Sequence, residues 1–170
     1  GKHLLDLINE VLDLARVESG KMSVSLEAVS VADLVQECVA LVQPQAQLRR
    51  VSVLADLCSP SVEVLADGIR LRQVLLNLLS NAIKYNHPGG SVHVACELTP
   101  VALKLLVTDS GPGLTADEWA RLFVPFERLN ADDHQVEGTG IGLALSKRLV
   151  QMMNGDIGVH SSKGCGSTFW

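Results

Sequence analysis

Apolar residues recur at helical spacing in several stretches of the chain, and the first of these stretches is residues 2–19. One side of this predicted helix carries Leu4, Leu5, Ile8, Val11, Leu12 and Ala15. Charged residues occupy the other side, and Gly20 follows as a typical helix end. So wide an apolar stripe must contact another surface, which is either the rest of the same domain or a helix of a dimer partner.

Capping residues mark the starts of further helices. Ser30 can cap a helix that starts at Val31, and Pro44 should bend or break that helix. Its expected buried face consists of Leu34, Val35, Cys38, Leu41 and Val42. Asp67 can cap a longer helix that runs to about Tyr85. Two more helices are expected, at 116–122 behind the capping residue Thr115 and at about 141–153.

Short β-rich runs separated by turn signals predict the strands. They are residues 24–29, 51–57, 62–66, 91–98, 101–108, 156–160 and 166–170. The second and third runs suit a hairpin or two edge strands, and the fourth and fifth suit adjacent antiparallel strands. Helices and strands mix in an order that does not repeat as βαβ, so the predicted fold class is α+β.

Composition narrows the function classes. Apolar residues make up 47% of the 170 residues and charged residues 19%, which allows a sizeable core and excludes intrinsic disorder. There are 14 Lys and Arg against 19 Asp and Glu, so we expect no binding to nucleic acid or to an anionic membrane surface. Any bound anion must then be held by local features rather than by the overall field.

The spacing of the cysteines and the hydropathy pattern indicate in which cellular compartment the chain is located. Cys38, Cys58, Cys96 and Cys165 are widely spaced and form no C-x-x-C pair, so we expect reduced thiols rather than a zinc site or a disulfide framework. No uncharged apolar run approaches the ~18–20 residues that a membrane-spanning helix needs. We therefore expect a cytoplasmic domain without direct membrane contact.

Four polar residues share one face of the predicted helix 67–85. Asn77, Asn81, Lys84 and Tyr85 are spaced i, i+4, i+7 and i+8. An Asn oxygen is a hard ligand that suits Mg²⁺, Lys84 could contact a phosphate, and Tyr85 offers a flat face to a base. The alternative is that the Asn side chains bond neighbouring loops and Tyr85 belongs to the core.

A carboxylate lies at the end of the predicted strand 101–108. Asp109 is followed by Ser110-Gly111-Pro112-Gly113, and such glycines let the backbone approach a flat ring closely. A charge-assisted hydrogen bond from an exocyclic amine to this carboxylate is worth about 1.5–3 kcal/mol, which is enough to select adenine over guanine. The alternative is a plain Asp-Gly turn.

A glycine-rich segment opens the predicted helix 141–153. Its sequence is Gly138-Thr139-Gly140-Ile141-Gly142-Leu143, which is neither a P-loop nor a Rossmann fingerprint. Glycine-rich backbone at a helix N-terminus nevertheless offers N–H groups and a partial positive charge to a phosphate. This segment is the local anion site that the net charge of -5 could not supply.

Four motifs in this order resemble the N, first glycine, F and second glycine boxes of sensor histidine kinases. They are Asn77–Tyr85, Asp109–Gly113, Phe123-Val124-Pro125-Phe126 and Gly138–Leu143. The resemblance runs from about Ser30 to Trp170 and implies the Bergerat fold shared with gyrase and MutL. That fold is a two-layer α/β sandwich, with a mixed sheet, three helices on one face and an ATP lid.

The resemblance also implies a reaction and its catalytic residues. A domain of this family transfers the γ-phosphate of ATP to a histidine, with Mg²⁺ as the second cofactor. Asn81 would ligate the Mg²⁺ between the phosphates, Lys84 would reach a phosphate, and Arg128 would meet the γ-phosphate. These three residues are the catalytic set, and Asn81 is the metal ligand.

The implied nucleotide-binding set is larger. It comprises Asn77, Asn81, Lys84, Tyr85, Asp109, Gly111, Gly113, Gly138, Thr139, Gly140, Ile141, Gly142, Leu143 and Thr168. By the resemblance, Tyr85 would cover the base, Asp109 would bind the adenine amine, and Thr168 would support Asp109 directly or through water. The segment 138–143 would cradle the phosphates as the lid closes.

Residues 1–22 resemble the second helix of the kinase dimerisation hairpin, which leaves 23–170 as the catalytic domain with a truncated last strand. The helix that carries the phosphoacceptor histidine is expected to lie outside this chain. Leu4 follows His3 where the family has Glu or Asp, so His3 should be an ordinary helix-end histidine. The implied partners are the dimerisation domain of the same homodimeric protein and a response regulator receiver domain. The fragment alone should bind ATP without autophosphorylating.

Two other functions remain open beside the kinase. Hydrolysing members of the superfamily carry a Glu one helical turn before the metal-binding Asn, where it activates water. Here that position is Asn77, which cannot act as a base, so hydrolysis should be slow. A gyrase-type ATPase is therefore one alternative, and a degenerate nucleotide-binding domain used for docking or regulation is the other.

Overall fold

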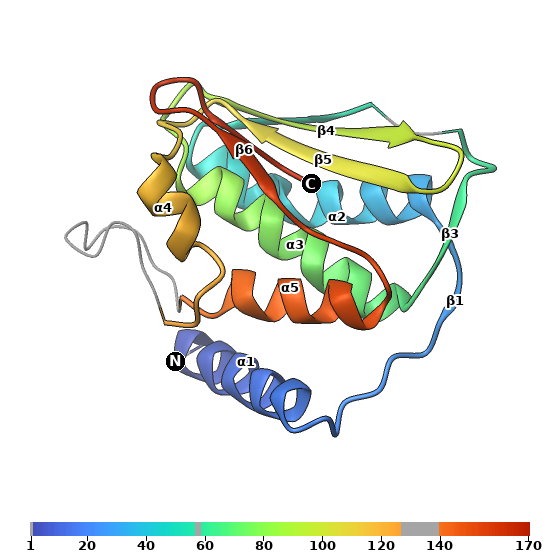
Figure 1. The fold of residues 1–170 in the computed structure, drawn as a ribbon. Coiled ribbons are helices and arrows are strands. Elements are labelled where there is room, and N and C mark those ends of the chain that lie inside the picture. Colours follow the sequence, from blue (N-terminus) through green and yellow to red (C-terminus); the bar gives the residue numbers. More distant parts are fainter. Residues whose placement is uncertain (1, 57–58, 127–139) are drawn as a thin grey trace.

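The computed structural model describes residues 2–56, 59–126 and 140–170, with side chains from residue 4 onward (Figure 1). The helices are α1 (Lys2–Glu18), α2 (Val31–Leu48), α3 (Gly68–Lys84), α4 (Ala116–Arg121) and α5 (Gly142–Met152). The strands are β1 (Glu27–Ser30), β2 (Ser52–Ala55), β3 (Glu63–Ala66), β4 (Ser91–Leu98), β5 (Leu103–Asp109), β6 (Val159–Ser161) and β7 (Ser167–Phe169).

Five of these strands form a mixed sheet in the order β2-β4-β5-β7-β6. The β2–β4 pair is parallel and the other three pairs are antiparallel. Helices α2, α3 and α5 lie on one side of this sheet, as Figure 1 shows, so the predicted two-layer α+β architecture is confirmed. β3 pairs with β1 in a separate two-stranded sheet, so β2 is an edge strand and forms no hairpin with β3.

The core lies between the sheet and α3. Leu75, Leu79 and Ile83 on α3 are buried, and they face a sheet whose inner side includes the buried Val92 and Val107. Burial of each such aliphatic side chain contributes about 1.5–3 kcal/mol. These contacts hold α3 in place, and the polar residues on its other face are therefore carried on a rigid support.

The predicted helix caps are present. The Ser30 side chain accepts from the backbone of Asp33, and the Asp67 side chain accepts from the backbone of Arg70. Thr115 takes part in a complete capping box at the start of α4. Each cap satisfies an N–H group that the helix itself leaves unpaired.

The predicted break of the second helix at Pro44 does not occur. α2 runs without interruption from Val31 to Leu48 and contains Pro44. Val42 and Ala46, on either side of the proline, are buried in the core, so packing outweighs the lost backbone hydrogen bond. Leu41, which was expected on the buried face of this helix, is exposed.

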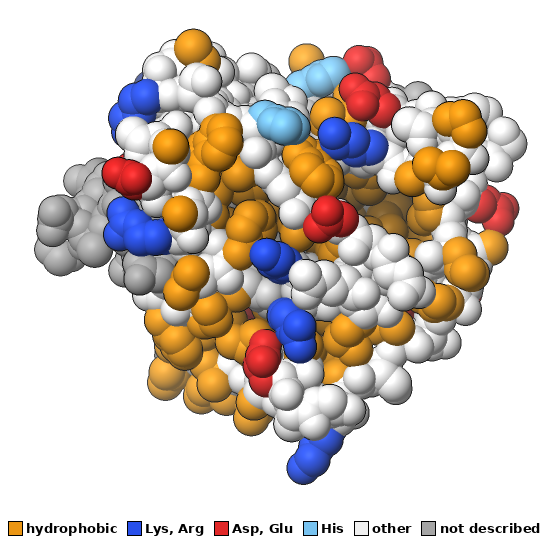
Figure 2. Space-filling model, in the orientation of Figure 1, with side chains coloured by type: hydrophobic (Ala, Val, Ile, Leu, Met, Phe, Trp, Pro, Cys, Tyr) orange, Lys and Arg blue, Asp and Glu red, His pale blue; other side chains and the backbone are white. Residues whose placement is uncertain are grey.

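α1 contacts α5, but not through the predicted apolar stripe. Leu14 and Val17 are buried in the contact, and the Glu18 carboxylate is 3.2 Å from Nε of Arg148 on α5. The stripe itself stays exposed, and Figure 2 shows hydrophobic side chains gathered over α1 at the lower left. Its exposed members are Leu4, Leu5, Ile8, Val11 and Leu12. α1 thus packs on its own domain and still presents a second, uncovered apolar face.

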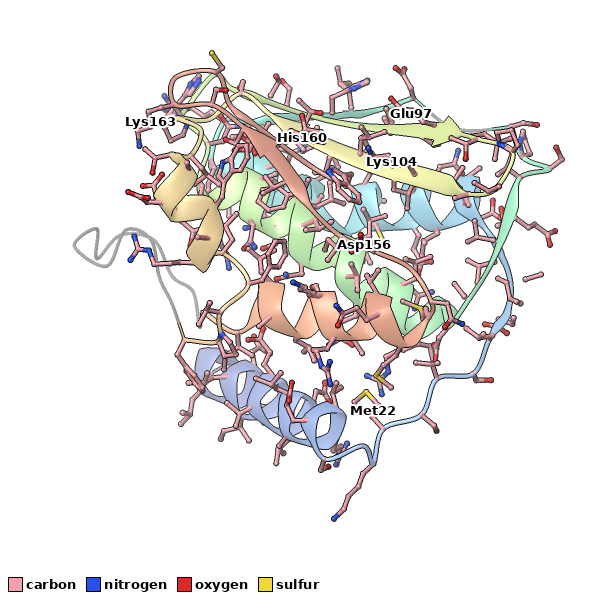
Figure 3. The ribbon with its side chains drawn as sticks, in the orientation of Figure 1. Met22, Glu97, Lys104, Asp156, His160 and Lys163 are labelled. Carbon is pink, nitrogen blue, oxygen red and sulfur yellow. The ribbon has the colours of Figure 1, made fainter. Side chains whose placement is uncertain are left out.

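The outer face of the sheet carries a small cationic and aromatic group. Lys104 lies on β5 and His160 on β6 (Figure 3). The Lys104 Nζ is 4.5 Å from the ring centroid of Trp170, and the His160 ring stacks on the same indole. Cation–π contacts of this kind contribute about 0.5–1 kcal/mol at exposed sites. They fasten the last residue of the chain to β5 and β6.

The structure also bears on the state of the cysteines and on the presence of a membrane-spanning helix. Cys96 is disulfide-bonded, so the expectation of four reduced thiols is wrong, whereas Cys38 and Cys165 are free. Burial raises the pKa of the Cys38 thiol to about 11. Within the described ranges, no helix combines the length and the hydropathy that a bilayer crossing requires.

Candidate nucleotide-binding site

α3 carries the four polar residues that the sequence singled out. Asn77, Asn81 and Lys84 are half-buried on the helix, and Tyr85 is exposed at its C-terminal end. From Asn77 to Tyr85 the helix rises about 12 Å, at about 1.5 Å per residue. The Tyr85 end of this row contacts the segment after β5, and the Asn77 end contacts α5.

At the Tyr85 end, α3 meets the segment that follows β5. The Gly111 backbone lies against Tyr85, and a Cβ atom at position 111 would be 2.8 Å from the Tyr85 carbonyl oxygen. Only glycine permits this close approach, so Gly111 has a structural requirement of its own. Gly113 lies against the backbone of Ser162 instead.

Asp109 lies beside this contact at the end of β5. Its Oδ1 accepts a hydrogen bond of 2.9 Å from the Gly111 N–H. Burial raises the pKa of Asp109 above its ordinary value, and hydrogen bonds from the backbones of Gly111 and Ser167 oppose that rise. A partly desolvated carboxylate of this kind is a strong acceptor for a ligand that can donate to it.

The predicted support of Asp109 by Thr168 is not found. In the β5–β7 register, Asp109 is opposite Ser167, and Thr168 is opposite Thr108. Side chains alternate between the faces of a strand, so Thr168 projects on the outer face, where its hydroxyl is 3.0 Å from that of Thr108. Ser167 is the β7 residue on the Asp109 side, and it is buried. Ser167 could not be identified from the sequence because no local pattern indicates the strand register.

A cleft of about 470 Å³ opens at the Tyr85 end of α3. Its lining residues are Tyr85, Asn86, His87, Ser110, Gly111, Pro112 and Gly164. The exposed Tyr85 and the glycine backbone offer flat surfaces on which a planar ring can lie. The composition of the cleft therefore suits an aromatic base.

At the other end of the row, Asn77 contacts the start of α5. Its Nδ2 donates to Oγ of the buried Ser146 at 3.2 Å, and its Oδ1 lies against the Cα of Gly142. Asn77 thus holds α5 against α3, which agrees with the alternative that its amide serves neighbouring structure. Ser146 was missed in the sequence because an isolated helical serine carries no functional signal.

Asn81 and Lys84 lie between these two ends. Among the described residues, neither side chain has a hydrogen-bond or ion-pair partner. The same part of the chain contains no group of three His, Cys, Asp or Glu that could bind a metal. A single amide oxygen still fits Mg²⁺, which takes one or two protein ligands and completes its shell with water and phosphate oxygens.

The N-terminus of α5 is the segment for which anion binding was predicted. Gly140 has φ +73°, Ile141 is fully buried, and no side chain caps the helix at Ile141. The Gly140 carbonyl accepts from the Phe126 N–H at 2.8 Å, which brings the F box to the glycine box. Leu143 lies in the first turn of α5. Arg128, Gly138 and Thr139 lie outside the described residues.

A family profile and the sequences of curated relatives place this chain in the same protein family. The profile of the family described as "Histidine kinase-, DNA gyrase B-, and HSP90-like ATPase" matches residues 66–170. The "Circadian input-output histidine kinase CikA" of Synechococcus elongatus is 40% identical over 99% of this chain and 23% of its own length. The "Cell-division control histidine kinase PdhS" of Brucella anthropi is 36% identical over 98% of this chain and 17% of its own length.

Solved structures agree with these sequences. Full-length ShkA in complex with AMPPNP has a TM-score of 0.88 and 34% identity, over 99% of this chain and 35% of that one. The Acinetobacter baumannii histidine kinase AdeS has a TM-score of 0.81 and 25% identity, over 98% of this chain and 75% of that one. The chain spans about a fifth of the length of the curated relatives that it matches. It belongs to the family of histidine kinase-, DNA gyrase B- and HSP90-like ATPases, and within it to the ATP-binding catalytic domains of histidine kinases.

Proposed function

We propose that the protein containing this chain transfers the γ-phosphate of ATP to a histidine of its own dimerisation hairpin. A response regulator receiver domain would then take the phosphate onto an aspartate. The observation that carries the proposal is the placement of Asn81 and Lys84 on α3, between the cleft at Tyr85 and the N-terminus of α5. Such a row can bind a nucleotide lengthwise, with its base in the cleft and its phosphates toward α5.

The polar row on α3 binds the base at its Tyr85 end and the phosphates toward α5. Asp109 accepts a hydrogen bond from the exocyclic amine of adenine, and Tyr85 covers the ring. Lys84 and the α5 backbone from Gly140 bind phosphate oxygens. The family resemblance assigns the γ-phosphate to Arg128, which lies outside the described residues. Asn81 would hold Mg²⁺, and the bound ion would offset the negative charge of the phosphates.

The chemistry favours transfer to a histidine over hydrolysis. Phosphoryl transfer depends chiefly on positioning and on charge neutralisation. Asn77 occupies the position where a hydrolysing relative would need a base, and its amide is bonded to Ser146. An imidazole nitrogen that attacks the γ-phosphorus displaces ADP and needs no base on α3. A water molecule that attacked the γ-phosphorus would need a base, and the amide at position 77 cannot serve as one.

The partners follow from the same proposal. The exposed stripe on α1 would pack against the other helix of the hairpin, in a homodimer of the parent protein. The excess of acidic over basic residues gives no reason to propose nucleic acid as a partner. We place the domain in the cytoplasm, where ATP and a receiver domain are present.

One experiment tests the transfer. This chain would be mixed with a separately produced dimerisation hairpin of the parent protein and with ATP labelled on its γ-phosphate. Acid-labile label on the hairpin is the expected result. Rapid steady-state ATP hydrolysis without labelled hairpin would instead support the gyrase-type alternative, and no calorimetric ATP binding would support a docking module.

A further inference from the structure

Asn86 directly follows Tyr85, the last residue of the N box, and its side chain makes hydrogen bonds to three other residues. Its Oδ1 accepts hydrogen bonds from the His87 N–H at 2.9 Å and from the Ser110 hydroxyl at 3.3 Å. Its Nδ2 donates to the Ser91 carbonyl oxygen at 2.9 Å. One carboxamide therefore joins the end of α3, the start of β4 and the segment after β5.

The orientation of this amide is determined by its partners. The His87 N–H can only donate and the Ser91 carbonyl can only accept, so the oxygen and the nitrogen of Asn86 cannot exchange places. The fit is also tight, because a Cβ atom at Gly90 would collide with the Asn86 Oδ1. Neither a carboxylate nor an apolar side chain of similar size would reproduce these contacts.

Ser110 completes the connection to the first glycine box. Its hydroxyl accepts from the Ser91 N–H at 2.8 Å, and its own N–H donates to the Ser91 carbonyl at 3.1 Å. The ring of His87 adds a further link, with Nε2 at 3.1 Å from the Ser110 carbonyl oxygen. Asn86, His87 and Ser110 all line the 470 Å³ cleft, next to Gly111.

We infer that Asn86 is a positioning residue that sets the shape of the base-binding cleft. It holds the turn after Tyr85 against Ser110, and thereby keeps Tyr85 and Gly111 in the close backbone contact that forms one wall of the cleft. It acts on the walls of the cleft and not on the phosphates. This inference rests on the proposed function, because that proposal makes the cleft the adenine site.

The test compares three ligands that share adenine and differ in phosphate. Binding of adenosine, ADP and ATP to the whole chain would be measured by calorimetry or by competition, with Mg²⁺ present. For Asn86→Asp we expect about a tenfold loss of affinity for all three ligands, the effect of about one lost hydrogen bond. The ratio of ATP to ADP affinity should not change, because the phosphate end is untouched.

Two further variants keep the test decisive. Asn9→Asp makes the same chemical change on the exposed face of α1 and should leave all three affinities unchanged. Ser110→Ala removes the hydroxyl that bonds Asn86 and the Ser91 N–H, but it keeps the backbone bond from Ser110 to the Ser91 carbonyl and adds no charge. It should therefore fold even if Asn86→Asp does not, and it should lower the three affinities equally. When Asn86→Asp is introduced into the Ser110→Ala variant, it should lower the ligand affinities by a smaller factor than it does in the unmodified chain, because the two residues act together.

The outcomes separate this inference from the proposed function. Unchanged adenosine affinity in folded Asn86→Asp or Ser110→Ala, or a loss confined to ATP, would overturn the positioning role alone. If the unmodified chain bound none of the three ligands, the adenine site would be refuted, and the positioning role with it.

Discussion

The two ends of the polar row on α3 are built differently. At the Tyr85 end, Asn86, Ser110 and Asp109 are engaged in hydrogen bonds within the protein. Toward α5, the side chains of Asn81 and Lys84 have no such partner among the residues the structure describes. The base end is therefore held by hydrogen bonds within the protein, whereas the phosphate end presents polar groups that have no partner in the described part of the chain.

This difference has a physical reason. A base is flat and largely apolar, so it is recognised by shape and by a few fixed groups, which must be held in advance. Phosphates and Mg²⁺ carry charge and bring their own hydrogen-bonding atoms. A site for them can leave an amide and an ammonium group half-buried and free until the ligand arrives. Substitutions at the two ends should therefore have different consequences for binding and for stability.

The largest effect is expected at the phosphate end, for Asn81→Asp. The new carboxylate would repel the phosphates, so Mg·ATP affinity should fall at least roughly 100-fold, which is about 2.7 kcal/mol. The melting temperature should stay the same, because the Asn81 side chain has no hydrogen-bond partner among the described residues. Calorimetry with and without Mg²⁺ measures the first effect. An unchanged Mg·ATP affinity would contradict the metal assignment.

At the base end, Asp109→Asn should weaken binding without weakening the fold. Loss of the charged acceptor should cost about 1.5–3 kcal/mol, or about 10- to 100-fold in ATP affinity. Burial raises the pKa of Asp109, so its ionised form is a cost to the folded state at neutral pH, and the amide removes that cost. We expect an equal or higher melting temperature. Equal binding of ATP and GTP by the unmodified chain would refute the proposed role of Asp109.

The same carboxyl group should make ATP binding depend on pH. Because the folded-state pKa of Asp109 is raised, the acceptor is lost by protonation at a higher pH than for an ordinary aspartate. ATP affinity should fall by about 10- to 100-fold as the pH is lowered through that pKa, because protonation removes the same charged acceptor as Asp109→Asn. The contribution of Asp109 to stability has the opposite sign: it is full below the unfolded-state pKa and is lost as the pH rises through the folded-state pKa. A matched titration of Asp109→Asn should lack both components.

The smallest effect is expected where Asn77 meets α5. Ser146→Ala leaves the Asn77 amide without its partner, so the free energy of unfolding should fall by about 1 kcal/mol. Urea denaturation of this variant and the unmodified chain measures the difference. Adenosine affinity should not change, since the cleft lies at the other end of α3. A large loss of adenosine affinity would show that the two ends are not independent.

Much of the site could be predicted from local sequence. The helical period alone places Asn77, Asn81 and Lys84 on one face of α3, because that period depends only on the backbone. Ser30, Asp67 and Thr115 were recognised as caps for the same reason, since a cap bonds a backbone group two or three residues away.

Failures occurred where distant segments meet. Thr168 was predicted beside Asp109 and Ser167 was missed because the strand register, which decides the face of each residue, is set by pairing across 60 positions of the chain. Pro44 was read as a helix break because the local rule omits the packing that holds α2 on α3. The exposed stripe on α1 was recognised, but the face that contacts α5 was not.

The sequence by itself determined the order of the elements, the caps, and the row of polar groups along one helix, since each depends on residues within about two turns of one another. Only the tertiary structure decided that Ser167 accompanies Asp109, that Ser146 binds Asn77, and that Asn86 joins three segments at the cleft. These pairings arise from burying α3 against the sheet, and burial depends on the whole chain rather than on any local pattern.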